Sequence, residues 1–198
     1  MKTLHDINEE GKALYGESPS SFTDKGADTG HTYITLYEEK LAKYRDSVNM
    51  LEIGVSSGGS LWLWRRYFKD YKITALDILP TWCVKRDFQK EIALDNNINI
   101  QWNMDSNNVN TWLDIEPEQF NIIIDDGDHW IDSQILNFEH AWPKLALGGL
   151  YIIEDVVNEQ FLPRLEDTIA KYPNASVEIY KGRIDTRPDD IVVLVTKV

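Results

Sequence analysis

The sequence has few of the features that a disulfide-rich or membrane-spanning protein needs. Cysteine occurs once in 198 residues, as Cys83, so the chain can close no internal disulfide and offers no CxxC pair for zinc. No stretch approaches the roughly 18 consecutive apolar residues of a spanning helix, and the first residues lack the apolar core of a signal peptide. We therefore expect a cytoplasmic protein without membrane contact.

Positive charge is also scarce, since 20 Lys and Arg stand against 33 Asp and Glu, a formal net charge of −13. A surface this acidic repels phosphate backbones, and the sequence contains no basic stripe or patch. Nucleic acid is therefore not an expected partner, whereas a homo-oligomer is left open. A hydrophobic share of 42% is enough for the core of one domain of ordinary size.

Strand and helix patterns alternate along most of the chain. Residues 1–30 are polar and rich in Gly, Ser and Asp, and we interpret them as an arm before a single domain over 31–198. Strands are predicted at 48–53, 72–77, 98–103, 120–126, 149–155, 176–180 and 191–195, the last two as a hairpin. A helix is predicted from His31 to Tyr44, and a second one follows the glycine turn and runs through Phe68. A third begins with a first turn at Pro80 and ends at about Leu94, and two more are predicted near 132–143 and 157–172. This alternation indicates a parallel sheet covered on both faces.

Acidic residues stand at the carboxyl end of each of the first five predicted strands. In an open parallel sheet, ligands bind outside this edge, so these acids point to one site. Along the chain they are Glu52, Asp77, Asp105, the pair Asp125 and Asp126, and the pair Glu154 and Asp155.

The glycine turn after the first strand departs from G-x-G-x-x-G and is weak evidence alone. Glu52 precedes the turn and disfavours a phosphate there, while Asp77 closes the next strand, where a ribose diol would be held. The pair suits a nucleoside that carries a cationic group and no pyrophosphate, as S-adenosylmethionine does. The alternative is that Gly54 and Gly59 serve only tight packing of strand against helix.

The segment 124–130 carries the most specific chemistry. Asp126 can converge with Glu154 and Asp155 from a neighbouring strand, and three hard oxygen ligands without cysteine favour Mg²⁺, Mn²⁺ or Ca²⁺ over zinc. His129 is close enough to reach a substrate bound to that metal. Trp130 is either an aromatic plate for a sugar ring or a packed loop anchor. In the arm, polar residues such as Lys25 are usually solvated, but such an arm can also close over a cofactor.

Five motifs together resemble the class I S-adenosylmethionine-dependent methyltransferases, and more narrowly the metal-dependent sugar O-methyltransferases of the macrocin and mycinamicin type. They are TDKG(x)₄HxY at 23–33, LEIGVSSGGSLWLW at 51–64, ALDI at 75–78, IIIDDGDHW at 122–130 and LGGLYIIED at 147–155. The resemblance implies a Rossmann-like, three-layer αβα fold with a mostly parallel seven-stranded sheet and an antiparallel last strand. It also implies S-adenosylmethionine, Mg²⁺ or Mn²⁺, and a sugar or glycan acceptor.

Residue by residue, the resemblance makes Asp126, Glu154 and Asp155 the metal ligands and His129 the general base, with Asp126 sharing the catalytic role. It also implies a larger set of cofactor contacts, several of them on the arm. They are Lys25, His31, Tyr33, Glu52, Gly54, Ser60, Asp77, Ile78, Asp105, Ser106 and Asp125. Asp128 departs from the family pattern, because relatives often carry Ser at that position.

Three other functions stay open at this point. A metal-dependent methyltransferase of a catechol or small diol is the nearest. A hydroxylase on a related scaffold would need two histidines and a carboxylate for non-haem iron, and only His129 is well placed. A nucleoside-binding module without catalysis is the third.

Overall fold

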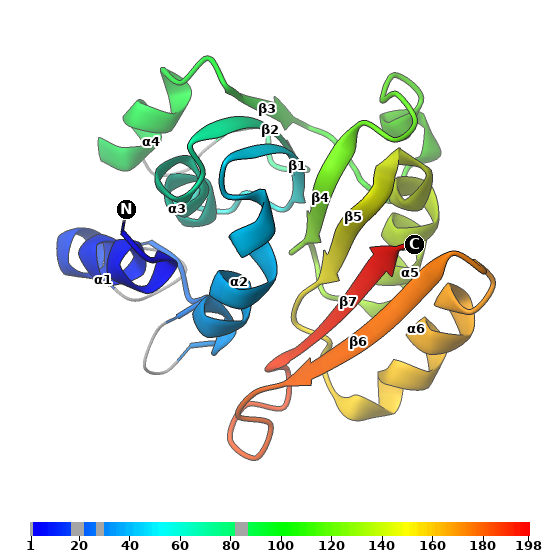
Figure 1. The fold of residues 1–198 in the computed structure, drawn as a ribbon. Coiled ribbons are helices and arrows are strands. Elements are labelled where there is room, and N and C mark those ends of the chain that lie inside the picture. The colour runs from blue at the N-terminus through cyan, green and yellow to red at the C-terminus, as the bar shows by residue number, and fades with distance from the viewer. Residues whose placement is uncertain (1, 17–21, 27–29, 82–86) are drawn as a thin grey trace.

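Seven strands form one sheet in this computed structural model, which describes residues 2–16, 22–26, 30–81 and 87–198 (Figure 1). The sheet order is β3-β2-β1-β4-β5-β7-β6, and β7 alone runs antiparallel to its neighbours. This confirms the predicted fold class and the terminal hairpin. The strands are β1 (Ser47–Ile53), β2 (Asp70–Asp77), β3 (Ile98–Trp102), β4 (Phe120–Asp125), β5 (Leu145–Ile153), β6 (Ala175–Lys181) and β7 (Ile191–Lys197).

Helices cover both faces of the sheet, as the uninterrupted apolar strands predict. Side chains of β4 alternate between two apolar cores: Ile122 and Ile124 pack into one, and Ile123 packs into the other. The first core is shared with α1 (Leu4–Tyr15), α2 (Tyr33–Leu41), α3 (Gly59–Tyr67) and α4 (Asp87–Ala93); the second is shared with α5 (Ile131–Ala141) and α6 (Leu162–Ile169).

The N-terminal arm contains a helix that the sequence patterns do not predict. Thr3 caps α1 through a capping box with Asp6, and Leu4 and Ile7 are buried against the first core. Farther along, Phe22 packs edge-on against Trp62 of α3. The described parts of the arm therefore pack on the domain. Whether the arm closes over a cofactor stays a prediction, and its residues 17–21 and 27–29 lie outside the described ones.

The helix predicted from Pro80 is wrong at its start. Pro80 lies in a bend, because the backbone N–H of Leu79 donates to the carboxylate of Asp77 and turns the chain across the end of β2. Residues 82–86, Cys83 among them, lie outside the described residues, and α4 is described from Asp87. In the part of the chain that is described, no helix combines the length and apolar character needed to cross a membrane.

Candidate functional site

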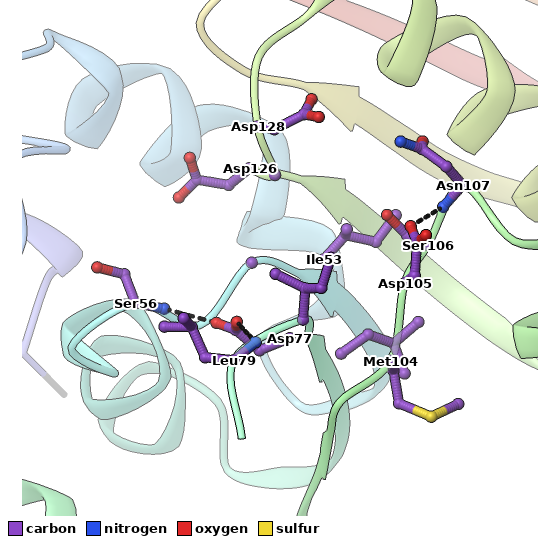
Figure 2. A pocket seen from close by; sticks show the side chains of 14 residues that line it. Ile53, Ser56, Asp77, Leu79, Met104, Asp105, Ser106, Asn107, Asp126 and Asp128 are labelled. Atoms are coloured by element: carbon purple, nitrogen blue, oxygen red, sulfur yellow. Dashed lines mark hydrogen bonds between the residues drawn. The ribbon is translucent and has the colours of Figure 1, made fainter. Parts of the chain in front are cut away.

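A cavity of about 300 Å³ opens at the carboxyl ends of β1 to β4, where the sequence predicts the site (Figure 2). This is the position that open parallel sheets offer to ligands. Residues from four successive strand ends form its wall, so distant parts of the chain meet there. The predicted site residues in the wall are Gly54, Asp77, Ile78, Asp105, Ser106 and Asp126.

Asp77 organises one side of the cavity. Its Oδ2 accepts hydrogen bonds from the backbone N–H groups of Val55 (2.8 Å) and Ser56 (3.0 Å), and its Oδ1 accepts one from Leu79 (2.8 Å). These bonds tie the glycine turn after β1 to the end of β2. The carboxylate is thus already used to shape the turn, and the expected ribose contact stays a prediction.

Gly54 allows the ends of β1 and β4 to approach closely. Its φ of +88° lies in the left-handed region, and a Cβ built there would come within 1.9 Å of the carbonyl oxygen of Asp126. Only glycine fits both conditions. This close approach sets Asp126 at one end of the cavity.

Asp126, His129 and Asp155 gather at that end. One potential ligand atom from each lies within 4.8 Å of the others, and Nδ1 of His129 is 3.8 Å from Oδ2 of Asp155. His129 (φ +61°) and Asp155 (φ +54°) both adopt left-handed backbone conformations. Such conformations cost free energy and persist where surrounding contacts enforce them, often at functional sites. Two carboxylates and an imidazole form a donor set that fits a divalent cation.

Glu154 faces the arm instead of this cluster. Its Oε2 lies 2.6 Å from Nζ of Lys25, and its Oε1 accepts a hydrogen bond from the hydroxyl of Tyr37. The same ammonium lies 2.7 Å from Oδ2 of Asp126. Burial raises the pKa of the Glu154 carboxyl well above its usual value, and the charge of Lys25 opposes that rise. Lys25 is therefore ion-paired between two of the predicted metal ligands, and it does not line the cavity.

His31 and Tyr33 both contact the carboxylate of Asp155. Nε2 of His31 lies 3.2 Å from Oδ1 of Asp155, and the hydroxyl of Tyr33 donates to the same oxygen at 2.6 Å. Burial raises the pKa of Asp155, but the hydrogen bond and electrostatic attraction of His31, together with the hydrogen bond from Tyr33, outweigh burial and hold that pKa below its usual value. His31 and Tyr33 thus both contact the acidic cluster, and neither lines the cavity.

Asp190, just before β7, is a neighbour of this cluster that sequence reasoning missed. It is fully buried, lies 3.4 Å from Nδ1 of His31, and accepts a hydrogen bond from the backbone of Thr32. No motif surrounds it, because its role depends on the β6–β7 hairpin folding back over the arm.

Three further predicted contacts, Glu52, Ser60 and Asp125, are buried and do not line the cavity. Glu52 accepts a hydrogen bond from Nε1 of Trp64 at 3.0 Å, and burial raises its pKa to about 7 although Lys25 opposes the shift. Burial likewise raises the pKa of Asp125 to about 7. Whether these three residues contact a cofactor stays a prediction.

Trp130 is not a packed anchor. Its side chain is 73% exposed beside His129, and it stands at the start of α5. This exposure contradicts the packed loop anchor, and the aromatic plate for a sugar ring stays a prediction.

Comparisons with known proteins point to one group of enzymes. A family model described as a methyltransferase domain matches residues 51–156, just over half of the chain. The chain is 29% identical over 164 residues to the 8-demethyl-8-alpha-L-rhamnosyl tetracenomycin-C 2'-O-methyltransferase of Streptomyces olivaceus, a match that covers 78% of this chain and 41% of the relative. It is 31% identical over 137 residues to the mycinamicin VI 2''-O-methyltransferase of Micromonospora griseorubida, covering 64% and 32%. The chain thus spans less than half the length of these relatives.

Among solved structures, the chain is similar to the MycE methyltransferase of the mycinamycin biosynthetic pathway in complex with Mg and SAH. The TM-score is 0.71 at 24% identity, and the match covers 99% of this chain and 55% of the other. An O-methyltransferase from Bacillus cereus in complex with SAH is similar with a TM-score of 0.63 at 18% identity, covering 98% and 90%. At these identities the likeness shows a shared fold.

Proposed function

Because the chain belongs to this methyltransferase-domain family, we propose that it is an S-adenosylmethionine-dependent and divalent-metal-dependent O-methyltransferase that acts on a sugar hydroxyl group. The observation that carries the proposal is one continuous site. A cavity walled by Asp77 and Asp105 ends at the group formed by Asp126, His129 and Asp155. The cavity volume is at the lower end of the range for sites that enclose small molecules.

The relatives support a sugar as acceptor. One is named for methylating a rhamnosyl tetracenomycin at a 2' oxygen, and another for methylating mycinamicin VI at a 2'' oxygen. A sugar carried on a larger molecule is therefore the acceptor class that we propose for this chain. Trp130 directly follows His129 and is exposed, and aromatic faces readily pack against the apolar face of a sugar.

Each residue of the site would have a distinct role in binding or proton transfer. Asp126 and Asp155 would hold the metal, and Glu154 would join them if Lys25 moved away. When bound, S-adenosylmethionine supplies an electrophilic methyl group and the cation supplies positive charge that acidifies a neighbouring hydroxyl. His129 would accept the hydroxyl proton on the nitrogen that faces away from Asp155. The surrounding strand ends would hold the reacting atoms in line.

Methyl transfer from labelled S-adenosylmethionine tests the proposal. We expect transfer to methyl rhamnoside or to a rhamnosylated polyketide in the presence of Mg²⁺ or Mn²⁺, and its loss on addition of EDTA. Catechol serves as the competing acceptor. Transfer to catechol and not to the sugars would show that the acceptor is a small diol. Full activity in protein stripped of divalent metal would rule out the metal-dependent reaction.

A further inference from the structure

His129 needs external support for its backbone. A residue with a side chain rarely adopts a positive φ, yet His129 has a φ of +61° one residue before Trp130, the N-cap of α5. The side chain of Trp130 makes no capping hydrogen bond to the helix. The support must come from elsewhere, and Asp128 supplies two hydrogen bonds around this turn.

Asp128 bridges the turn from both of its carboxylate oxygens. Oδ1 accepts from the backbone N–H of Trp130 at 3.1 Å, which closes a turn around His129, and Oδ2 accepts from the hydroxyl of Ser133 at 2.8 Å. The first bond fixes the residue that follows His129, and the second fixes the turn to the first turn of α5. An Asp side chain that bonds the backbone two residues ahead is a common way to stabilise such a turn.

The same hydrogen-bonded chain reaches the opposite wall of the cavity. Nδ2 of Asn107 donates to the Ser133 hydroxyl at 3.0 Å, and the backbone N–H of Asn107 donates to Oδ1 of Asp105 at 2.9 Å. Asp105 and Asn107 follow β3, while Asp128 follows β4, and all three line the cavity (Figure 2). The turn that carries His129 is thus connected to the loop predicted to lie near the nucleoside.

We propose that Asp128 is a positioning residue for methyl transfer: it holds His129 in its left-handed turn and couples that turn, through Ser133 and Asn107, to the wall of the cofactor cavity. This inference rests on the proposed function for its kinetic consequence. Its structural part concerns the free protein and can be tested alone. The departure of this chain from the family pattern at position 128 then has a physical role, because the Asp128 side chain bonds the backbone of Trp130 and the hydroxyl of Ser133 at the same time.

The test compares Asp128→Ala, which removes both acceptors, with Asp128→Asn, which can still accept from Trp130 and bond to Ser133. Asp132→Ala is the matched control, since Asp132 is a nearby acid in the first turn of α5 whose carboxylate pairs with Arg164 at the surface. The imidazole signals of His129 are followed by NMR in the free protein and with S-adenosylhomocysteine added. With only four histidines in the chain, single His→Ala variants assign them.

We expect Asp128→Ala to move the His129 signals in the free protein and to lower kcat by about 10²-fold, with a much smaller change in the dissociation constant of S-adenosylhomocysteine. Asp128→Asn should restore both, and Asp132→Ala should change neither. Unmoved His129 signals in Asp128→Ala, or no rescue by Asn, would overturn the positioning role.

Failure of the proposed function and failure of the positioning role can be distinguished. If the wild-type protein transfers no methyl group, the proposed function fails, while the NMR comparison still decides the role of Asp128. If Asp128→Ala does not fold, Ser133→Ala removes one of the two bonds and should shift the His129 signals by a smaller amount. Signals identical to wild type in Ser133→Ala would then contradict the inference.

Discussion

At the scale of single residues, the proposed function makes His129 the proton acceptor. Its Nδ1 lies 3.8 Å from Oδ2 of Asp155, and Nε2 is the ring nitrogen that would accept a proton from a substrate. We expect His129→Ala to lower kcat by at least about 10²-fold, the lower range for loss of a general base, while binding of S-adenosylhomocysteine is retained. Titration calorimetry and initial rates measure the two effects. His5→Ala, on the exposed side of α1, is the control; an equal loss of activity there would deny His129 a specific role.

Glu52 makes the free energy of unfolding depend on pH. Burial raises its pKa from 4.5 to about 7, so the folded state favours the protonated form. Its contribution to stability is fully present below pH 4.5 and is lost as the pH rises through 7, a cost of about 3 kcal/mol. Glu52→Gln should therefore unfold at higher urea concentration than wild type at pH 8, with little difference at pH 4.5. The exposed Glu116→Gln is the control. A variant less stable than wild type at pH 8 would contradict this account.

Trp130 tests the acceptor side of the site. Because its ring is 73% exposed, Trp130→Ala should leave the stability of the fold unchanged within about 0.5 kcal/mol. We expect it to raise the KM for a sugar acceptor while the KM for S-adenosylmethionine stays the same. Leu147→Ala, which removes a side chain of similar exposure on β5, should change neither constant. Equal acceptor KM values for Trp130→Ala and wild type would exclude a contact with the sugar.

At the scale of elements, the turn after β1 depends on one glycine. Gly54→Ala places a Cβ against the backbone of Asp126, whereas Gly148→Ala meets nothing within 4 Å. Both positions have a positive φ, so both variants pay the left-handed strain of about 1 kcal/mol and only Gly54→Ala also forces β1 and β4 apart. We expect thermal unfolding to show the larger loss for Gly54→Ala, together with loss of S-adenosylhomocysteine binding. Equal losses for the two variants would show that the close approach is unimportant.

The strands and the location of the site could be predicted because both follow from local patterns. Apolar runs such as β4 mark buried parallel strands, and parallel strands must end at one edge, which brings Asp77 and Asp126 to the same cavity. What each side chain contacts depends on distant packing and could not be predicted. Lys25 meets Glu154, 129 residues away, only because the arm packs on the domain, with Phe22 against Trp62 of α3. The helix α1 was missed because few apolar residues mark its buried face.

At the scale of the whole molecule, the charge of −13 is partly concentrated at one edge of the sheet. The acids there repel one another, and burial raises the pKa values of Asp125 and Asp126. Lys25 from the arm offsets some of that charge. A divalent cation at Asp126 and Asp155 would offset more, and binding energy would then add to the stability of the fold.

The proposed function requires the cofactor cavity and the metal position to form one site. A crystal soaked with S-adenosylhomocysteine and Mn²⁺, with diffraction recorded at the manganese absorption edge, tests it most directly. We predict the nucleoside in the cavity between Asp77 and Asp105 and an anomalous peak bonded to the carboxylates of Asp126 and Asp155. A nucleoside bound elsewhere, or manganese absent from these two carboxylates, would contradict the account.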